Sequence, residues 1–472
     1  MHNSFIIEQG LGEWRAATIG ADGFPEDIHF LSGPSLSAVD VVFRARVTEV
    51  NPSLDMAFFD LGSGRQGCMS LRRAKQLVKG RVNSISDCLT EGQTLLVQGV
   101  ADPSALEQKA IQLSAKPRLV GRFVVVEQAA PRLFFSKDLP PRTQKLLAPV
   151  LTDVAARHSV IVRTAACDQP VSAVAAEAAW LASAFDDAHS KGKPGVVFAL
   201  TPLEQALMSA PDQQEKTEED ASEGKIMIAS GTVMAEAKKL CADRWPDLVD
   251  RLSLWNRSEN IFEEMGVEEA VEEALADQIN LPSGGWITIE ETKALTVIDV
   301  NVGSALQGRP AAEALLTVNM EAALAALYHL RFQDIGGLIV IDFVDMSAKG
   351  SAAELVRVID EAIKDDPVPV RRSGLSQFGL MELSRRRKGL SLRQRMQRRR
   401  GPVTAGRAVA LDLLRQAEKV GLSKGAGDLI LTLPAGGYKF LEEHKGLVVE
   451  LEQRVHRTCR LVQGDRPHAQ LK

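Results

Sequence analysis

Two short, apolar, largely β-branched stretches each carry an aspartate near the carboxyl end, and this feature constrains the chain most strongly. Residues 295–304 read LTVIDVNVGS, and residues 338–346 read LIVIDFVDM. A buried carboxylate without a partner is costly, so each aspartate needs either a structural partner or a functional role. Because side chains alternate along a strand, Asp299 and Asn301 are expected to share one face.

The segment between the two stretches predicts that they are neighbouring parallel strands. Its apolar residues follow the i, i+4, i+7 spacing of a helix of about twenty residues; they are Leu316, Met320, Ala323, Leu327 and Leu330. A strand–helix–strand order favours a parallel pair joined by a right-handed crossover. Asp342 would then lie near Asp299 at the carboxyl edge, where open α/β sheets bind ligands.

Three oxygen ligands at one sheet edge, without cysteine or histidine, favour magnesium or manganese over zinc. Such an ion would polarise a phosphodiester and activate a water molecule. Asp345, just past the strand end, is a weaker candidate. The alternative is structural, because aspartates at strand ends also cap loops or pair with arginines, and spacing alone leaves both interpretations open.

The bulk composition excludes several classes of protein. The net charge is −5 over 472 residues, so attraction to nucleic acid must be local. The five cysteines are scattered and form no C-x-x-C pair, which indicates reduced thiols in a cytoplasmic protein and no zinc site. The first residues, MHNSFIIEQG, do not resemble a signal peptide, and no run reaches the ~18 apolar residues of a membrane span.

The first half of the chain divides into three segments by pattern. Residues 1–36 are a short β-rich opening. Residues 37–120 hold about five short strands with glycine-rich turns, which is typical of an OB-type barrel. Residues 121–212 mix strands with alanine-rich helical stretches and indicate a separate α/β unit.

The second half begins after an acidic stretch. From Asp212 to Glu223 there are six acids and one lysine, which predicts a solvated linker. Helical patterns follow at 232–243 and 261–279. Beyond the paired acidic strands the chain becomes basic, and residues 401–472 are expected to form a small α/β domain.

Three long blocks in the second half resemble the catalytic core of the ribonuclease E/G family. They are LPSGGWITIEETKALTVIDVN, NMEAALAALYHLRFQDIGGLIVIDFVDM and SQFGLMELSRRRKGLSL, between about residues 280 and 392. Weaker similarity extends over most of the chain. The stretch VTEVNPSLDMAFFDLGSGRQG resembles the family's S1 RNA-binding domain, and VIVRTAA resembles its 5′-phosphate sensor.

The resemblance implies a multidomain α/β fold with RNase H-like and DNase I-like α/β subdomains and an inserted S1 domain, which is a β-barrel of the OB type. The expected units are an RNase H-like subdomain (1–36 and 213–279), an S1 domain (37–120), a 5′-phosphate sensor-like region (121–212), a DNase I-like catalytic subdomain with a basic tail (280–400) and a small C-terminal domain (401–472).

The resemblance also implies an activity. By similarity, Asp299 and Asp342 hold a magnesium ion (or manganese) that activates water for cleavage of single-stranded RNA, and Asn301 orients Asp342. The chain departs from the family pattern in two places. Val302 replaces a small hydroxyl residue, and RQRMQRRRGPVTAG contains no cysteine where the family places a zinc-binding pair. No zinc is therefore expected, and any homo-oligomer would lack a zinc link.

Two predicted RNA contacts lie in the S1-like segment. Phe58 matches a family aromatic on which a base would stack, and Lys109 matches a lysine that reaches a phosphate. A second aromatic position carries Cys68 instead. Because the segment reads AFF, packing of Phe58 inside the barrel is the alternative.

Other predicted RNA contacts follow from charge. Arg163 and Thr164, at the end of an apolar strand, suit a terminal phosphate. The family's glycine loop is not evident in EQAAPRLFFSKDLPP, so 5′-end sensing is expected to be weakened.

Residues 371–400 hold eleven Lys or Arg against one Glu, and a basic run binds phosphates without sequence preference. The residues predicted to contact RNA there are Arg385, Arg386, Arg387 and Lys388, unless the run is a solvated linker.

The leading hypothesis is a magnesium-dependent, single-strand-specific endoribonuclease that acts in rRNA processing and mRNA turnover, as a short ribonuclease G-like member. Its partner is single-stranded RNA, and no membrane is involved. The alternative is an RNA-binding protein of the same fold with weakened or lost catalysis. A DNA-directed phosphodiesterase is a third interpretation, because the carboxylates alone do not distinguish the two nucleic acids.

Overall fold

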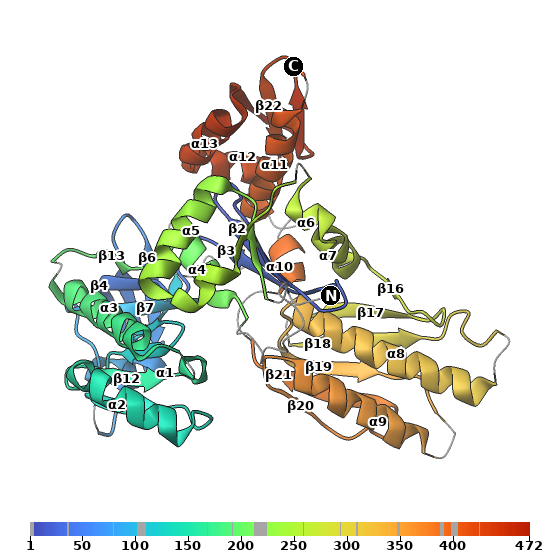
Figure 1. The fold of residues 1–472 in the computed structure, drawn as a ribbon, viewed down its shortest axis with the longest axis horizontal. Helices are drawn as coiled ribbons and strands as arrows, with labels where there is room; N and C mark the ends of the chain where they lie inside the picture. The colour runs from blue at the N-terminus through green and yellow to red at the C-terminus, as the bar shows by residue number, and fades with distance from the viewer. Residues whose placement is uncertain are drawn as a thin grey trace.

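The computed structural model arranges the chain in lobes around a central sheet (Figure 1). The lobe coloured blue to green holds a β-barrel and lies to the left in Figure 1, the yellow and orange lobe lies to the right, and the red C-terminal segment lies above. The described residues are 4–34, 37–78, 80–101, 110–167, 169–190, 192–211, 224–257, 259–292, 294–307, 310–346, 350–387, 391–397, 405–423 and 425–472.

The central sheet joins the start of the chain to a segment more than two hundred residues later. Three antiparallel strands form one side, and β1 then pairs in parallel with β14, which pairs in parallel with β15. Phe5 on β1 lies opposite Ile226 on β14. The strands are β1 (Ser4–Glu8), β2 (Trp14–Ile19), β3 (Pro25–Leu31), β14 (Ile226–Ile228) and β15 (Leu252–Leu254).

Helices from several parts of the chain pack around this sheet. Helix α5 (Gly231–Arg244) packs against β14 and β15, as the pattern at 232–243 predicted. The pattern at 261–279 predicted one helix, and this prediction is wrong. The chain forms α6 (Ile261–Glu264) and α7 (Val267–Leu275), because Gly266 between them adopts a left-handed φ of 70° that ends the first helix.

The predicted barrel is present as five strands that close on themselves. The order is β4-β5-β6-β8-β7, and β7 returns to pair with β4. Phe43, Phe59 and Met69 fill its interior. Short helix α1 (Leu71–Ala74) follows the third strand. The strands are β4 (Val42–Asn51), β5 (Met56–Asp60), β6 (Gln66–Ser70), β7 (Thr94–Ala101) and β8 (Ile111–Ser114).

The next unit is a four-stranded sheet covered by helices, in the order β11-β12-β10-β9. A further strand, β13 (Gly195–Phe198), leaves this unit and pairs with β4 of the barrel. The predicted acidic linker from Asp212 to Glu223 lies outside the described residues. The elements are β9 (Arg118–Val120), β10 (Val124–Glu127), β11 (Arg132–Phe135), β12 (Ser159–Val162), α2 (Pro141–Ala155), α3 (Val171–Ser190) and α4 (Pro202–Ser209).

The yellow and orange lobe contains the two acidic strands in a sheet ordered β16-β17-β18-β19-β21-β20. The predicted hairpin, helix and parallel pair are all present, since β17–β18 is antiparallel and β18–β19 is parallel. In Figure 1, α8 and α9 lie over one face. The elements are β16 (Ile279–Asn280), β17 (Trp286–Glu291), β18 (Leu295–Asn301), α8 (Ala311–Phe332), β19 (Gly337–Asp342), α9 (Ser351–Ala362), β20 (Val370–Arg372) and β21 (Leu380–Arg385).

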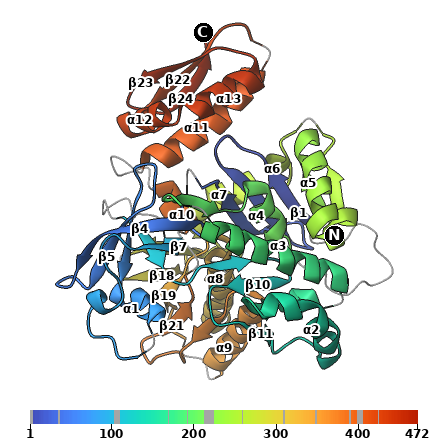
Figure 2. The ribbon, with the colours of Figure 1, turned by 90° about the vertical axis from the view of Figure 1, so that its left-hand side faces the viewer.

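The C-terminal segment, for which a small α/β domain was predicted, contains a three-stranded sheet with helices packed beside it (Figure 2). Its sheet has the order β23-β22-β24, and Leu11 from the start of the chain packs into its core. No helix among the described residues combines the length and apolar character needed to cross a membrane. The elements are α10 (Leu392–Gln397), α11 (Ala405–Leu422), β22 (Leu429–Leu433), α12 (Ala435–Glu443), α13 (Lys445–Val455), β23 (Cys459–Gln463) and β24 (His468–Leu471).

Candidate active site

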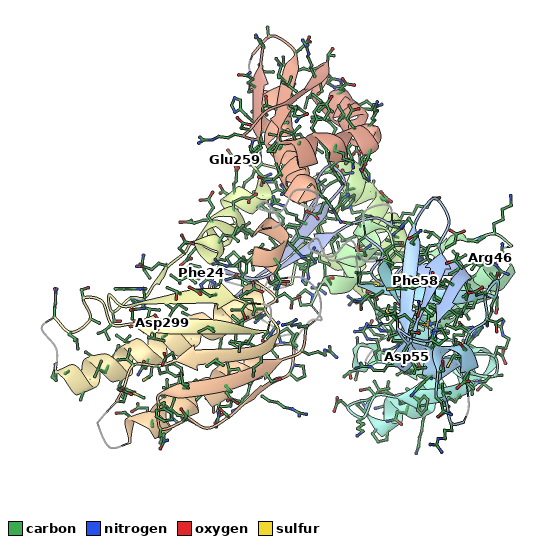
Figure 3. The ribbon with its side chains drawn as sticks, turned by 180° about the vertical axis from the view of Figure 1, so that it is seen from behind. Phe24, Arg46, Asp55, Phe58, Glu259 and Asp299 are labelled. Atoms are coloured by element: carbon green, nitrogen blue, oxygen red, sulfur yellow. The ribbon has the colours of Figure 1, made fainter. Side chains whose placement is uncertain are left out.

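Asp299 and Asp342 lie directly opposite each other on the parallel strands β18 and β19. Both are exposed, at the carboxyl edge of the strand pair. Their neighbours Ile298 and Ile341 point to the other face and are buried in the core that α8 helps to form. The predicted juxtaposition of the two carboxylates is therefore present, on the face away from the helices, where Figure 3 labels Asp299.

Asn301 contacts a different aspartate from the one that the family resemblance implied. Its side-chain Nδ2 donates a 2.7 Å hydrogen bond to Oδ2 of Asp299, whereas the expected partner was Asp342. The reason is local, because residues two apart on one strand share a face and their side chains lie within reach. The bond therefore restrains the Asp299 carboxylate.

Asn319 holds the chain that follows Asp342, and sequence reasoning did not identify it. The residue is fully buried on α8, where Nδ2 donates to the carbonyl of Val344 at 2.7 Å and Oδ1 accepts from the Val344 amide at 3.0 Å. This pair of bonds ties the loop after β19 to the helix. A signal existed in the sequence, since Asn319 is a polar residue within the apolar stretch of a helix.

The two carboxylates are oxygen ligands that could hold a divalent cation. No lysine or arginine among the described residues forms an ion pair with either of them. Like charges directly opposite each other on neighbouring strands repel, so a cation between them would be stabilising. In the described chain no third Asp, Glu, His or Cys completes a cluster of three. Magnesium suits such a site, because it often binds through one or two carboxylates, with waters and substrate phosphates as the other ligands.

Comparison with known proteins identifies the family. A sequence profile described as the Ribonuclease E/G family matches residues 118–388, which is more than half of the chain. This chain belongs to the ribonuclease E/G family. The predicted family relationship is confirmed, and with it the prediction of an endoribonuclease of this type. The matched range contains the paired aspartates.

Three curated relatives show how the chain compares with whole members of the ribonuclease E/G family. It is 26% identical to ribonuclease G of Haemophilus influenzae over 91% of this chain and 90% of that protein. It is 25% identical to ribonuclease G of Escherichia coli over 82% of this chain and 80% of that protein. Its 28% identity to Escherichia coli ribonuclease E covers 88% of this chain but only 40% of that protein.

The basic run of this ribonuclease E/G family member divides into structural and exposed residues. Arg385 is 2% exposed, and its guanidinium donates to Asp366 at 2.7 Å and to Asp334 at 3.0 Å. The prediction that Arg385 contacts RNA therefore fails, because its charge is used inside the fold. Arg386 and Arg387 are exposed, as the prediction requires. Lys388 lies outside the described residues.

Two further arginines of the run, Arg372 and Arg393, also have structural partners. Arg372 donates to both carboxylate oxygens of Asp360 at 2.7 and 2.6 Å. Arg393 is buried and donates to the carbonyls of Ala274 and Ala276, which join α10 to the end of α7. The described part of the run is therefore folded, and the interpretation as a solvated linker does not apply to it.

Arg163 and Thr164 lie just after β12, and both side chains are exposed. The Thr164 hydroxyl lies 2.8 Å from the hydroxyl of Ser136, and Nη1 of Arg163 donates to the carbonyl of Gly121 at 2.5 Å. Gly121 precedes the strand RFVVVE and lies outside residues 127–141, the stretch in which no glycine loop is evident. Gly121 is therefore adjacent to Arg163, and weakened 5′-end sensing stays a prediction.

A buried carboxylate holds the backbone beside Arg163. Glu177 on α3 accepts hydrogen bonds from the amides of residues 122, 123 and 124 at 2.7–2.9 Å and from the indole of Trp245 at 2.8 Å. Burial raises the pKa of Glu177, and these four donors act in the opposite direction. A Cβ added at Gly121 would lie 2.4 Å from this carboxyl group, so only glycine fits.

In the barrel, Phe58 and Phe59 point in opposite directions along β5. Phe59 is buried in the core, whereas Phe58 is half-buried and lies opposite Cys68 on β6. The ring of Phe58 is thus outside the main barrel core, which favours the stacking interpretation over the packing one. Figure 3 places Phe58 and Asp299 on separate lobes. Lys109 lies outside the described residues.

Proposed function

We propose that this protein is a magnesium-dependent, single-strand-specific endoribonuclease that acts in rRNA processing and mRNA turnover. The observation that carries the proposal is the pairing of Asp299 with Asp342, two exposed carboxylates in register without a cationic partner among the described residues. Their mutual repulsion is relieved when a divalent cation binds between them. Membership in the ribonuclease E/G family supports RNA as the substrate.

The residues of the site have distinct roles in this proposal. Asp299 and Asp342 would hold the magnesium ion, and the ion would supply polarisation of the phosphodiester and a lower pKa for an attacking water. Asn301 keeps the Asp299 carboxylate in one orientation through its hydrogen bond. Asn319 fixes the loop after Asp342, so both carboxylates are held on rigid elements before substrate arrives.

RNA binding is distributed over three other places. Phe58 stacks on a base at the barrel surface, and Arg163 with Thr164 binds a terminal phosphate, for which a guanidinium fork and a hydroxyl are suitable donors. Arg386 and Arg387 contact the RNA backbone next to the catalytic sheet. The arrangement of the central sheet, three antiparallel strands followed by two parallel ones, supports an RNase H-like subdomain.

Cleavage of an unstructured RNA oligonucleotide tests the proposal. The wild-type protein is expected to cut the RNA with magnesium and to leave it intact when the metal is chelated. Asp299→Asn is expected to abolish cutting and to retain binding. Glu290→Gln is the matched control, because Glu290 is exposed on β17, one strand away on the same face. Tight binding without cleavage would instead favour the catalytically weakened RNA-binding protein, and equal cleavage of single-stranded DNA would contradict the RNA specificity.

A further inference from the structure

Phe378 has the most exposed large apolar side chain among the described residues, at 71%. It lies in the turn of residues 376–379, immediately before β21. A single exposed leucine or valine needs no explanation, but a phenylalanine ring held mostly in water exposes a large apolar area without benefit to folding. Exposure alone does not set this ring apart, because Phe24 is 67% exposed, so the position of Phe378 in the fold has to decide whether it has a role.

The turn that carries Phe378 is closed by several hydrogen bonds. The amide of Gly379 donates to the carbonyl of Ser376 at 3.2 Å, and the hydroxyl of Ser376 accepts from the amides of Phe378 and Leu380 at 3.2 and 3.1 Å. Gly379 has a left-handed φ of 79°, which glycine adopts without strain. These contacts fix the backbone on both sides of Phe378 and leave its ring directed away from the core.

The same turn is attached to the catalytic edge. Leu380 lies opposite Asp342 in the β19–β21 register, and the amide of Phe343 donates to the carbonyl of Gly379 at 3.1 Å. Neighbouring strands are about 5 Å apart, and two residues of chain span at most about 7 Å. The Cα of Phe378 is therefore within about 12 Å of the Cα of Asp342, a distance that a single nucleotide and a phenyl ring together bridge.

We propose that Phe378 is a specificity-determining residue, which stacks on an unpaired RNA base next to the phosphate held at Asp299 and Asp342. This deepens the proposed function and rests on it. An aromatic ring stacks on any base whose face is free, and bases in a duplex are already stacked on their neighbours. The ring would thus select single-stranded RNA at the point of cleavage without selecting a sequence.

The first test compares kcat/KM for an unstructured RNA oligonucleotide in three variants. Phe378→Ala is expected to lower kcat/KM about tenfold to a hundredfold, the range that loss of one stacked base gives. Phe378→Trp is expected to restore it, because tryptophan also stacks. Phe24→Ala is the matched control, because Phe24 is also exposed, at 67%, but lies away from the catalytic edge. The carbonyl of the adjacent Pro25 accepts a hydrogen bond from Tyr328, near the carboxyl end of α8. Unchanged kcat/KM in Phe378→Ala would overturn the inference.

The second test identifies the stacked base. A set of oligonucleotides, each lacking one base near the cleavage site, is offered to wild type and to Phe378→Ala. Wild type is expected to lose activity with one of them, and Phe378→Ala is expected to be insensitive to that same loss, because its partner is already absent. Equal sensitivity of both proteins would show that Phe378 stacks on no base.

The two tests remain informative if wild type proves unable to cleave RNA. In that case the proposed function fails, and the same oligonucleotides are used in binding measurements with Asp299→Asn and with Asp299→Asn combined with Phe378→Ala. A base whose removal weakens binding only when Phe378 is present supports the stacking, and identical affinities for all oligonucleotides contradict it.

Discussion

The side-chain amide of Asn301 donates a hydrogen bond to the carboxylate of Asp299, two residues earlier on the same strand. The partner aspartate across the strand pair, Asp342, is held instead through its backbone, by the register with β18 and by the contact of Asn319 with Val344. The two acids of one site are thus positioned by different means. Substitutions of the supporting residues Asn301 and Asn319 should therefore have different effects, the first on the Asp299 side chain and the second on the backbone after Asp342.

Asn301→Ala removes the restraint on Asp299 without touching the core. A hydrogen bond to a charged group contributes about 1.5–3 kcal/mol, and the exposure of this site favours the lower end. We expect kcat to fall about tenfold and the magnesium concentration for half-maximal activity to rise, whereas the free energy of unfolding stays within about 0.5 kcal/mol of wild type. Steady-state kinetics over a magnesium series measures this. Wild-type metal dependence in the variant would show that Asn301 does not position the carboxylate.

Arg385→Ala should destabilise the fold rather than weaken RNA binding. The substitution leaves Asp366, which is itself buried, without its ion-pair partner. Breaking a buried pair in this way costs about 3–5 kcal/mol, and urea unfolding measures the loss. Arg386→Ala is the matched control, because the adjacent arginine is exposed. It should leave stability unchanged and weaken RNA affinity at low salt. The reverse pattern in the two variants would restore Arg385 as an RNA contact.

Arg163→Lys keeps the positive charge but loses the planar fork that suits a phosphate. The expected result is a fall of about tenfold in the preference for RNA with a 5′-monophosphate over RNA with a 5′-hydroxyl. Cleavage of the 5′-hydroxyl RNA should not change. Arg132→Lys serves as the control, since Arg132 is exposed at the opposite end of the adjacent strand β11. An equal loss on both RNAs would mean that Arg163 has no role in 5′-end sensing.

Stability should decline in mild acid because of His329. Burial, with a further contribution from the positive charge of Arg393, lowers the pKa of His329 to about 4. The pKa of this histidine in the unfolded chain is near 6.5, so the unfolded chain takes up the proton first as the pH falls. The free energy of unfolding is therefore highest above pH 6.5 and falls by about 3 kcal/mol in total as the pH drops toward 4. His329→Gln should flatten the decline in unfolding free energy between pH 7 and pH 5. Parallel curves for the two proteins would contradict this assignment.

The paired carboxylates could be predicted from sequence because the signal is local and repeated. Alternation along 295–301 sets which side chains share a face, and the helical spacing of 311–332 indicates a crossover that returns the chain in parallel. The register follows from burying one face of each strand. Ile298 and Ile341 are buried together, which brings Asp299 and Asp342 together on the other face.

The partners of the basic residues could not be predicted from sequence. Arg385 pairs with Asp334 and Asp366, which are 51 and 19 residues away along the chain, and nothing in a run of arginines distinguishes the buried one from its exposed neighbour. Gly121 was missed for a similar reason, because its contact with Arg163 joins positions 42 residues apart. Local sequence patterns identify helices, strands and their buried faces. The pairing of polar groups that are distant in sequence depends instead on the tertiary packing of the folded chain.

The central sheet has a consequence for synthesis of the protein. Strand β1, whose residues Phe5, Ile6 and Ile7 are all destined for the interior, emerges long before its parallel neighbour β14, which follows more than two hundred residues later. At translation rates of about 5–20 residues per second, this interval is about 10 to 45 seconds. During that time the barrel can close on the ribosome, while the edge of β1 remains unpaired and open to chaperones or to aggregation.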